Sequence, residues 1–312
     1  MAYTVFLTIL TMLLYAVPGF LLIKSKLVGA QSISAFSVVL MYVLQPCLTI
    51  HSFQKITFTP VLAVNMLVCF AVALGAMGVF LGLLFLLLRK KQGEVTYRVS
   101  TVACAFGNAS FIGIPILESV LPECSEAAAY SIVFFLAMSA LGWTVASAII
   151  MRDKKYISVK KIFLNPATLS LVAAVLLGLI DVFFDWKIPA PFAGMFEVLA
   201  GMSTPVCMLV MGFRLATADW KKLFLSWQHY AVIFVKQVVF PLAVFAVLLL
   251  LPVDRNLKIC LFVMSCCPVA AVVQSYAEMI GEGQEEAADM VLLSSASCIL
   301  TIPLLTLLLP FL

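Results

Sequence analysis

Charged residues are scarce in this sequence. Asp, Glu, Lys and Arg make up 11% of the 312 residues, whereas 64% are hydrophobic. A soluble globular domain carries roughly a quarter charged residues, so a soluble protein is excluded. One helical membrane span needs about 20 apolar residues, and the chain therefore has room for about ten spans and for no separate soluble domain.

Sequence signals of several other protein classes are missing. The net charge of +4 is too small, and the basic residues too dispersed, for a nucleic-acid-binding patch. The nine cysteines form no CxxC pair and lie almost all in apolar runs, so we expect neither metal ligands nor disulfides. A Gly-rich ATP-binding loop, an HExxH motif and paired aspartates are also missing. These absences argue against an enzyme, a cofactor and ATP-driven transport.

Long uncharged stretches, bounded by charges or by Pro and Gly, predict the membrane spans. The first stretch continues to Ile23 with no basic residue at its start, so we expect a retained span and not a cleaved signal peptide. The sequence predicts an all-α polytopic membrane protein whose spans cover 3–23, 34–53, 60–88, 99–121, 127–150, 166–184, 192–213, 228–251, 257–280 and 287–311.

The basic residues predict the orientation of these spans. Fourteen of the 19 Lys and Arg fall in odd-numbered loops, four fall in even-numbered loops, and Lys236 lies inside a span. Short cytoplasmic loops accumulate Lys and Arg, so we expect the odd loops inside and both termini outside. The expected location is the plasma (inner) membrane, crossed many times.

The two halves of the chain resemble each other in the order of their spans. An offset of 159 residues places span 34–53 on 193–212 and Pro46 on Pro205. Two five-span units must be inserted upside down relative to each other, as in many secondary transporters. The sequence therefore predicts two inverted five-helix repeats, residues 1–155 and 156–312.

The fourth and ninth predicted spans contain helix-breaking residues at membrane depth. Backbone groups freed by Pro or Gly inside a bilayer must face protein, water or a ligand, and the N-termini of broken helices attract anions. The alternative is an ordinary Pro kink supported by neighbouring helices. On the binding interpretation, the candidate substrate-binding residues are Gly107, Asn108, Ser110, Gly113, Pro115, Pro268, Gln274 and Tyr276.

Ionisable residues inside spans are costly and mark function by default. Lys236 could bind a substrate carboxylate, form a fixed ion pair with Asp289 or Glu278, or change its protonation during transport, and the sequence leaves these alternatives open. Three acidic residues are candidates for ion coupling: Glu118, Glu278 and Asp289.

Four motifs resemble the auxin efflux carrier family, which includes plant auxin exporters and bacterial carriers proposed for malate and malonate. They are the 107–115 string GNASFIGIP, Asn165-Pro166, Lys236 followed by Pro241, and Asp289 followed by Ser294-Ser295 and Thr301-Ile302-Pro303. The chain is similar to the bacterial members because it has no long central hydrophilic loop. Ser110 stands where the family usually has Gly. No acidic pair lies mid-membrane in the fourth or ninth span, so antiporter-type ion coupling does not carry over.

This resemblance implies the fold of bile-acid sodium symporters and sodium/proton antiporters. It implies crossing fourth and ninth helices, scaffold and transport domains each drawn from both repeats, an elevator-type motion and a homodimer. We therefore expect a secondary transporter of a small organic anion, such as malate, malonate or an auxin-like aromatic acid. The alternatives are a sodium- or proton-coupled symporter of a larger, bile-acid-like anion, and a channel. The expected partners are the anion, the lipid bilayer, and a proton or sodium ion.

Overall fold

The computed structural model describes residues 2–152, 160 and 164–312, and its regular elements are helices. The all-α prediction is confirmed for these residues. Lys154, Lys155 and Lys161 of the fifth predicted loop, and the predicted repeat boundary at 155/156, lie outside the described part.

The helices of the first half are α1 (Ala2–Leu14), α2 (Ala16–Lys24), α3 (Ser32–Val39), η1 (Leu40–Leu44), α4 (Gln45–Gln54), α5 (Pro60–Leu87), α6 (Val95–Ala103), η2 (Ala109–Gly113), α7 (Ile114–Val120), α8 (Ala127–Leu141), η3 (Gly142–Ala146) and α9 (Ser147–Met151). Those of the second half are α11 (Pro166–Phe184), α12 (Ala190–Gly201), α13 (Ser203–Thr217), α14 (Trp220–Leu225), α15 (Trp227–Phe234), η5 (Val235–Val239), α16 (Phe240–Leu250), α17 (Arg255–Cys266), α18 (Val272–Ile280), α19 (Gln284–Leu305) and η6 (Thr306–Phe311).

Eight helical stretches among the described residues are long and apolar enough to cross a membrane, and the chain is accordingly a multi-pass membrane protein. They cover Ala2–Lys24, Ser32–Gln54, Pro60–Leu87, Ala127–Met151, Pro166–Phe184, Ala190–Thr217, Trp227–Leu250 and Gln284–Phe311. The other two predicted spans, 99–121 and 257–280, fall on helices that are broken in the middle. Two predicted ends were wrong by four residues: span 192–213 continues to Thr217, and span 99–121 begins at Val95. They place Arg214 and Arg98 inside helices instead of loops.

Three of these helices contain a π-helical turn directly before a proline. The π-turns η1, η2 and η5 each end two residues before Pro46, Pro115 or Pro241. Proline donates no backbone hydrogen bond and its ring displaces the carbonyl four residues back, and a widened turn relieves this clash. The prolines therefore bend these helices without ending them.

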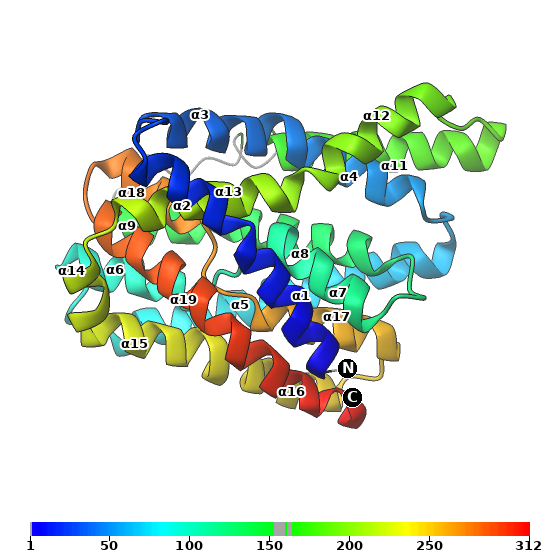
Figure 1. The fold of residues 1–312 in the computed structure, drawn as a ribbon. Coiled ribbons are helices and arrows are strands. Elements are labelled where there is room, and N and C mark those ends of the chain that lie inside the picture. Colours follow the sequence, from blue (N-terminus) through cyan, green and yellow to red (C-terminus); the bar gives the residue numbers. More distant parts are fainter. Residues whose placement is uncertain (1, 153–159, 161–163) are drawn as a thin grey trace.

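The helices form two groups that pack against each other. In one group α2 packs along α13, and α4 packs along α11 and α12. In the other, α8 packs on α5 and α17, and α17 on α16. Figure 1 shows α3, α4, α11 and α12 along one edge of the molecule and α5, α15 and α16 along the opposite edge. The broken helices belong to the second group.

One end of the molecule collects the basic loops, and we call it the basic end. Arg98 donates to the Ile150 carbonyl and pairs with Glu282 at 3.5 Å, while Lys222 Nζ lies 2.9 Å from Glu285. The hydrogen bond to Glu285 raises the pKa of Lys222. Both chain termini lie at the opposite end, where α1 packs against α19 (Figure 1). This segregation agrees with the loop assignment from sequence, although which membrane face the basic end occupies stays a prediction.

Candidate functional site

The two broken helices touch each other at their breaks. Helix α6 ends at Ala103 and the chain becomes helical again at Ala109, while α17 ends at Cys266 and α18 begins at Val272. The Asn108 amide donates to the Pro268 carbonyl at 2.8 Å, and the Ala270 amide donates to the Phe106 carbonyl at 3.1 Å. We call residues 104–108 and 267–271 the crossing. Each break therefore satisfies backbone groups that the other leaves free, as a non-helical segment away from water requires.

Neighbouring helices hold the crossing in place through side-chain hydrogen bonds. The Val269 amide donates to Ser294 Oγ of α19 at 3.0 Å, and Ser131 Oγ of α8 donates to the Ala109 carbonyl at 3.0 Å. Two helical pieces begin beside the crossing. The first is η2 followed by α7, and the second is α18. Their first amides present partial positive charge there, so the crossing suits an anionic group.

Asn108 and Ser110 both have polar side-chain groups beside the crossing. The half-buried Asn108 side chain lies near the Cys207 thiol of α13. Ser110 Oγ is buried and has no hydrogen-bond partner among the described residues. A buried hydroxyl without a partner costs about 1–3 kcal/mol, which a ligand could offset. The structure thus places both predicted residues beside the crossing, and their contact with an anion stays a prediction.

Lys236 is fully buried and lies against Gly107 of the crossing. Its Nζ donates to the Ser265 carbonyl in the last turn of α17 at 2.8 Å and lies 4.7 Å from the Phe240 ring centroid. A Cβ added to Gly107 would come within 3.2 Å of Nζ. No carboxylate of the described residues lies within 4.0 Å of Nζ, so the ion pair with Asp289 or Glu278 was a wrong alternative for this conformation. The ammonium instead caps the C-terminus of α17, where a cation is favourable.

Three other candidates serve close packing around the crossing. A Cβ on Gly113 would meet Met264 Cε at 2.6 Å, so this position admits no side chain without movement. Pro115 follows the π-turn η2 inside the helical piece 109–120, which bends at this point. Tyr276 is 1% exposed and its ring meets Trp143 edge to face at 5.5 Å. Their contact with substrate stays a prediction.

The remaining candidates divide between the two ends of the molecule. Gln274, Glu278 and Asp289 line one cavity of about 720 Å³ at the basic end, between α3, α13, α18 and α19. Gln274 Nε2 donates to Glu278 Oε1 at 3.0 Å. Glu118 is exposed near the end of α7, where the positive charge of Lys55 attracts its carboxylate. The structure therefore separates Glu118 from the other two coupling candidates, and the coupling role of all three stays a prediction.

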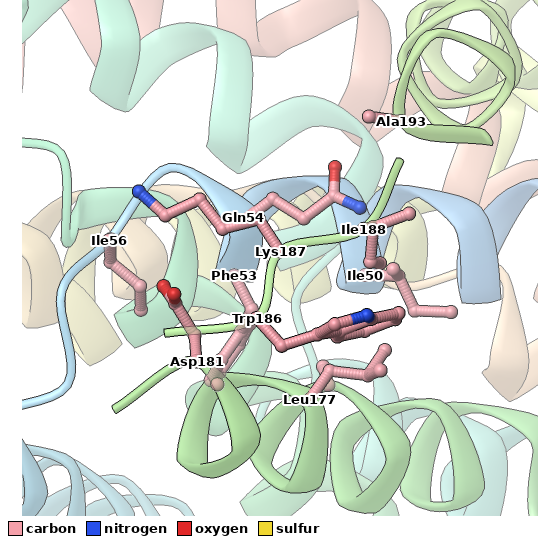
Figure 2. Close-up of a pocket in the computed structure, with 12 residues that line it drawn as sticks. Ile50, Phe53, Gln54, Ile56, Leu177, Asp181, Trp186, Lys187, Ile188 and Ala193 are labelled. Carbon is pink, nitrogen blue, oxygen red and sulfur yellow. The ribbon is translucent and has the colours of Figure 1, made fainter. Parts of the chain in front are cut away.

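A smaller cavity of about 190 Å³ lies at the opposite end, between α4, α11 and the 185–189 connection (Figure 2). Asp181, Lys187 and Gln54 surround its apolar floor, and the Trp186 ring stands beside it. None of the sequence-predicted site residues lines this cavity.

Sequence reasoning missed a polar network next to Lys236. Gln237 Nε2 donates to the Ser294 carbonyl at 2.6 Å, and Ser297 Oγ donates to Gln237 Oε1 at 2.6 Å. Because Ser294 Oγ also accepts from the Val269 amide, the network ties η5 and α19 to the crossing. The signal in the sequence is Gln237, an amide that directly follows Lys236 in an otherwise apolar run.

Comparison with known proteins identifies the family of this chain. No curated protein matches it. The family model described as membrane transport protein matches residues 4–306, almost the full length. This match confirms the resemblance to the auxin efflux carriers. The chain belongs to this membrane transport protein family.

Proposed function

We propose that this protein is a secondary transporter that binds a small organic anion at the crossing. The observation that carries the proposal is the pair of hydrogen bonds between the two breaks, Asn108 amide to Pro268 carbonyl and Ala270 amide to Phe106 carbonyl. Two helix N-termini and the unpartnered Ser110 hydroxyl adjoin this point, and donors of this kind favour a carboxylate over a cation.

The proposed transport cycle is an elevator-type motion of one helix group past the other. In this motion, α1–α4 of the first repeat and α11–α13 of the second form a fixed scaffold. The remaining helices of both repeats form a moving unit that contains the crossing. The division is supported by the tight packing of α2 on α13, and by a cavity bounded on one side by α3 and α13 and on the other by α18 and α19. Ten membrane crossings, eight continuous and two broken, follow from the same proposal.

Uptake into proteoliposomes tests the proposal. The purified chain is reconstituted, and uptake of labelled succinate, malonate and indole-3-acetate is measured with an imposed pH gradient, an imposed sodium gradient, or neither. Saturable uptake that internal substrate accelerates is expected, and the gradient that drives it identifies the coupling ion. Non-saturable flux without acceleration would indicate a channel, and no flux from folded protein would contradict the anion proposal.

Asn108→Ala is expected to reduce the initial uptake rate about tenfold or more, because a hydrogen bond to a charged group contributes about 1.5–3 kcal/mol. The melting temperature should change little, since the backbone bonds of the crossing remain. Asn65→Ala is the matched control: Asn65 donates to Tyr130 Oη at 3.3 Å in the same helix group, away from the crossing. Equal transport by wild type and Asn108→Ala would remove Asn108 from the site.

A further inference from the structure

Arg214 is a cation inside a long apolar helix, and it forms no ion pair with the described residues. It lies in the last turn of α13, seven residues after Cys207, so the two side chains point to the same face of the helix. Its Nε and Nη1 atoms are buried, and neither has a hydrogen-bond partner among the described residues. These two buried donors are therefore free to bind a group that enters the cavity.

The guanidinium lines the cavity of about 720 Å³ at the basic end. The other cation of its wall, Lys222, is engaged with Glu285 at 2.9 Å. Three further carboxylates line the wall: Asp219 accepts from the Lys221 amide, Glu278 accepts from Gln274 Nε2, and Asp289 forms no ion pair within 4.0 Å among the described residues. Glu278 attracts Arg214 electrostatically, but the two form no ion pair within 4.0 Å. Arg214 is therefore a cation of this wall that no carboxylate of the described residues pairs directly.

The position of Arg214 connects the cavity with the crossing. Seven residues correspond to about 10 Å along a helix, and a long side chain leans toward the helix N-terminus, which shortens the axial distance to Cys207. The Cys207 thiol in turn lies near the Asn108 side chain of the crossing. Beside Arg214 in the cavity wall, Gln274 Oε1 is buried with no partner among the described residues. A small anion held by Arg214 would therefore lie on the face of α13 that also carries Cys207.

We propose that Arg214 forms a carboxylate-binding site in this cavity, through which the organic anion passes between the basic end and the crossing. The inference rests on the proposed transport function and adds a residue and a subsite to it. Arginine suits this role because its planar fork donates two parallel hydrogen bonds to one carboxylate. The open cavity lets a hydrated anion reach the guanidinium.

The test measures the charge preference of the cavity without measuring flux. Ser275, a small residue of the cavity wall, is changed to Cys. The purified full-length chain in detergent is labelled with the anionic 2-sulfonatoethyl methanethiosulfonate or with the cationic trimethylammonium analogue, and modification at position 275 is followed by peptide mass spectrometry. Adding Arg214→Gln is expected to lower the ratio of anionic to cationic labelling rates about tenfold, because one unpaired charge of the same cavity wall is removed.

Lys222→Gln, in the same Ser275→Cys chain, is the matched control. Its charge is compensated by Glu285, so the labelling ratio should change less than about twofold. Succinate should slow labelling of the Ser275→Cys chain, should act weakly on the Arg214→Lys form and should have no effect on the Arg214→Gln form. Succinate protection that survives Arg214→Gln, or a labelling ratio that does not respond to this substitution, would overturn the proposal.

A structural ion pair between Arg214 and Glu278 gives a different pattern. In that case Glu278→Gln would restore the stability and transport lost in Arg214→Gln, and such rescue would also overturn the carboxylate site. Because the labelling ratio requires no flux, a chain that transports none of the tested acids but keeps an Arg214-dependent ratio would contradict the proposed function and leave this inference supported.

Discussion

A Gly212→Leu chain is expected to lose most of its folded, monodisperse protein. A Cβ at Gly212 of α13 would stand 1.9 Å from the Ala16 carbonyl oxygen of α2, and a Cβ at Gly19 would stand 2.2 Å from the Leu209 carbonyl oxygen. The obstacles are backbone atoms, so no side-chain rotation relieves the clash. Overpacking costs about 1–3 kcal/mol or more where the backbone must shift, and without a hydrophobic driving force between membrane helices, close contact carries their association.

Size-exclusion chromatography and thermal unfolding of the purified chain measure this effect. Gly75→Leu is the control, because a Cβ at Gly75 in α5 meets no described atom within 4 Å. The control should keep the wild-type elution profile and melting temperature. A Gly212→Leu chain as stable as the control would mean that α2 and α13 do not form this backbone contact in the membrane.

The positions of the helices could be predicted because apolar length and bounding charge are local properties of the sequence. The prediction of span 60–88 matches α5, Pro60–Leu87, within one residue. It failed at Arg214, because a charge was taken as the end of the span. The helix continues there because the guanidinium faces a protein cavity and not lipid, and no local pattern distinguishes these two environments.

The location of the breaks could also be predicted, but the partners of the site residues could not. Gly107, Asn108 and Pro268 indicate interrupted helices by their own chemistry. The partner of Lys236 is the backbone carbonyl of Ser265. Since every residue carries a carbonyl, such a partner has no sequence signature. Reasoning from charge alone therefore offered Asp289 and Glu278 as protein partners, and both lie instead in the wall of the cavity at the basic end.

Lys236→Met is expected to reduce the initial uptake rate about tenfold to a hundredfold. Methionine keeps the length and apolar volume of the side chain but removes the charge-assisted hydrogen bond to the Ser265 carbonyl, a bond of about 1.5–3 kcal/mol. The α17 C-terminus then loses its cap directly beside the crossing, and Gly107 loses the ammonium that lies against it. Uptake by the reconstituted chain, with its KM and maximal rate, measures the change. Lys221→Met, an exposed residue of α14, is the control.

Two readouts distinguish a capping role of Lys236 from direct binding of the anion. If the ammonium caps α17, Lys236→Met lowers the melting temperature and speeds amide hydrogen exchange at 263–266, and the maximal rate falls. If it binds the anion, KM rises and both stability readouts stay near wild type. We expect the capping pattern, since Lys236 is 0% exposed and lines neither described cavity. Adding Asp289→Asn should restore nothing, because the two charges do not meet within 4.0 Å; rescue by that substitution would show that another conformation of the transporter pairs them.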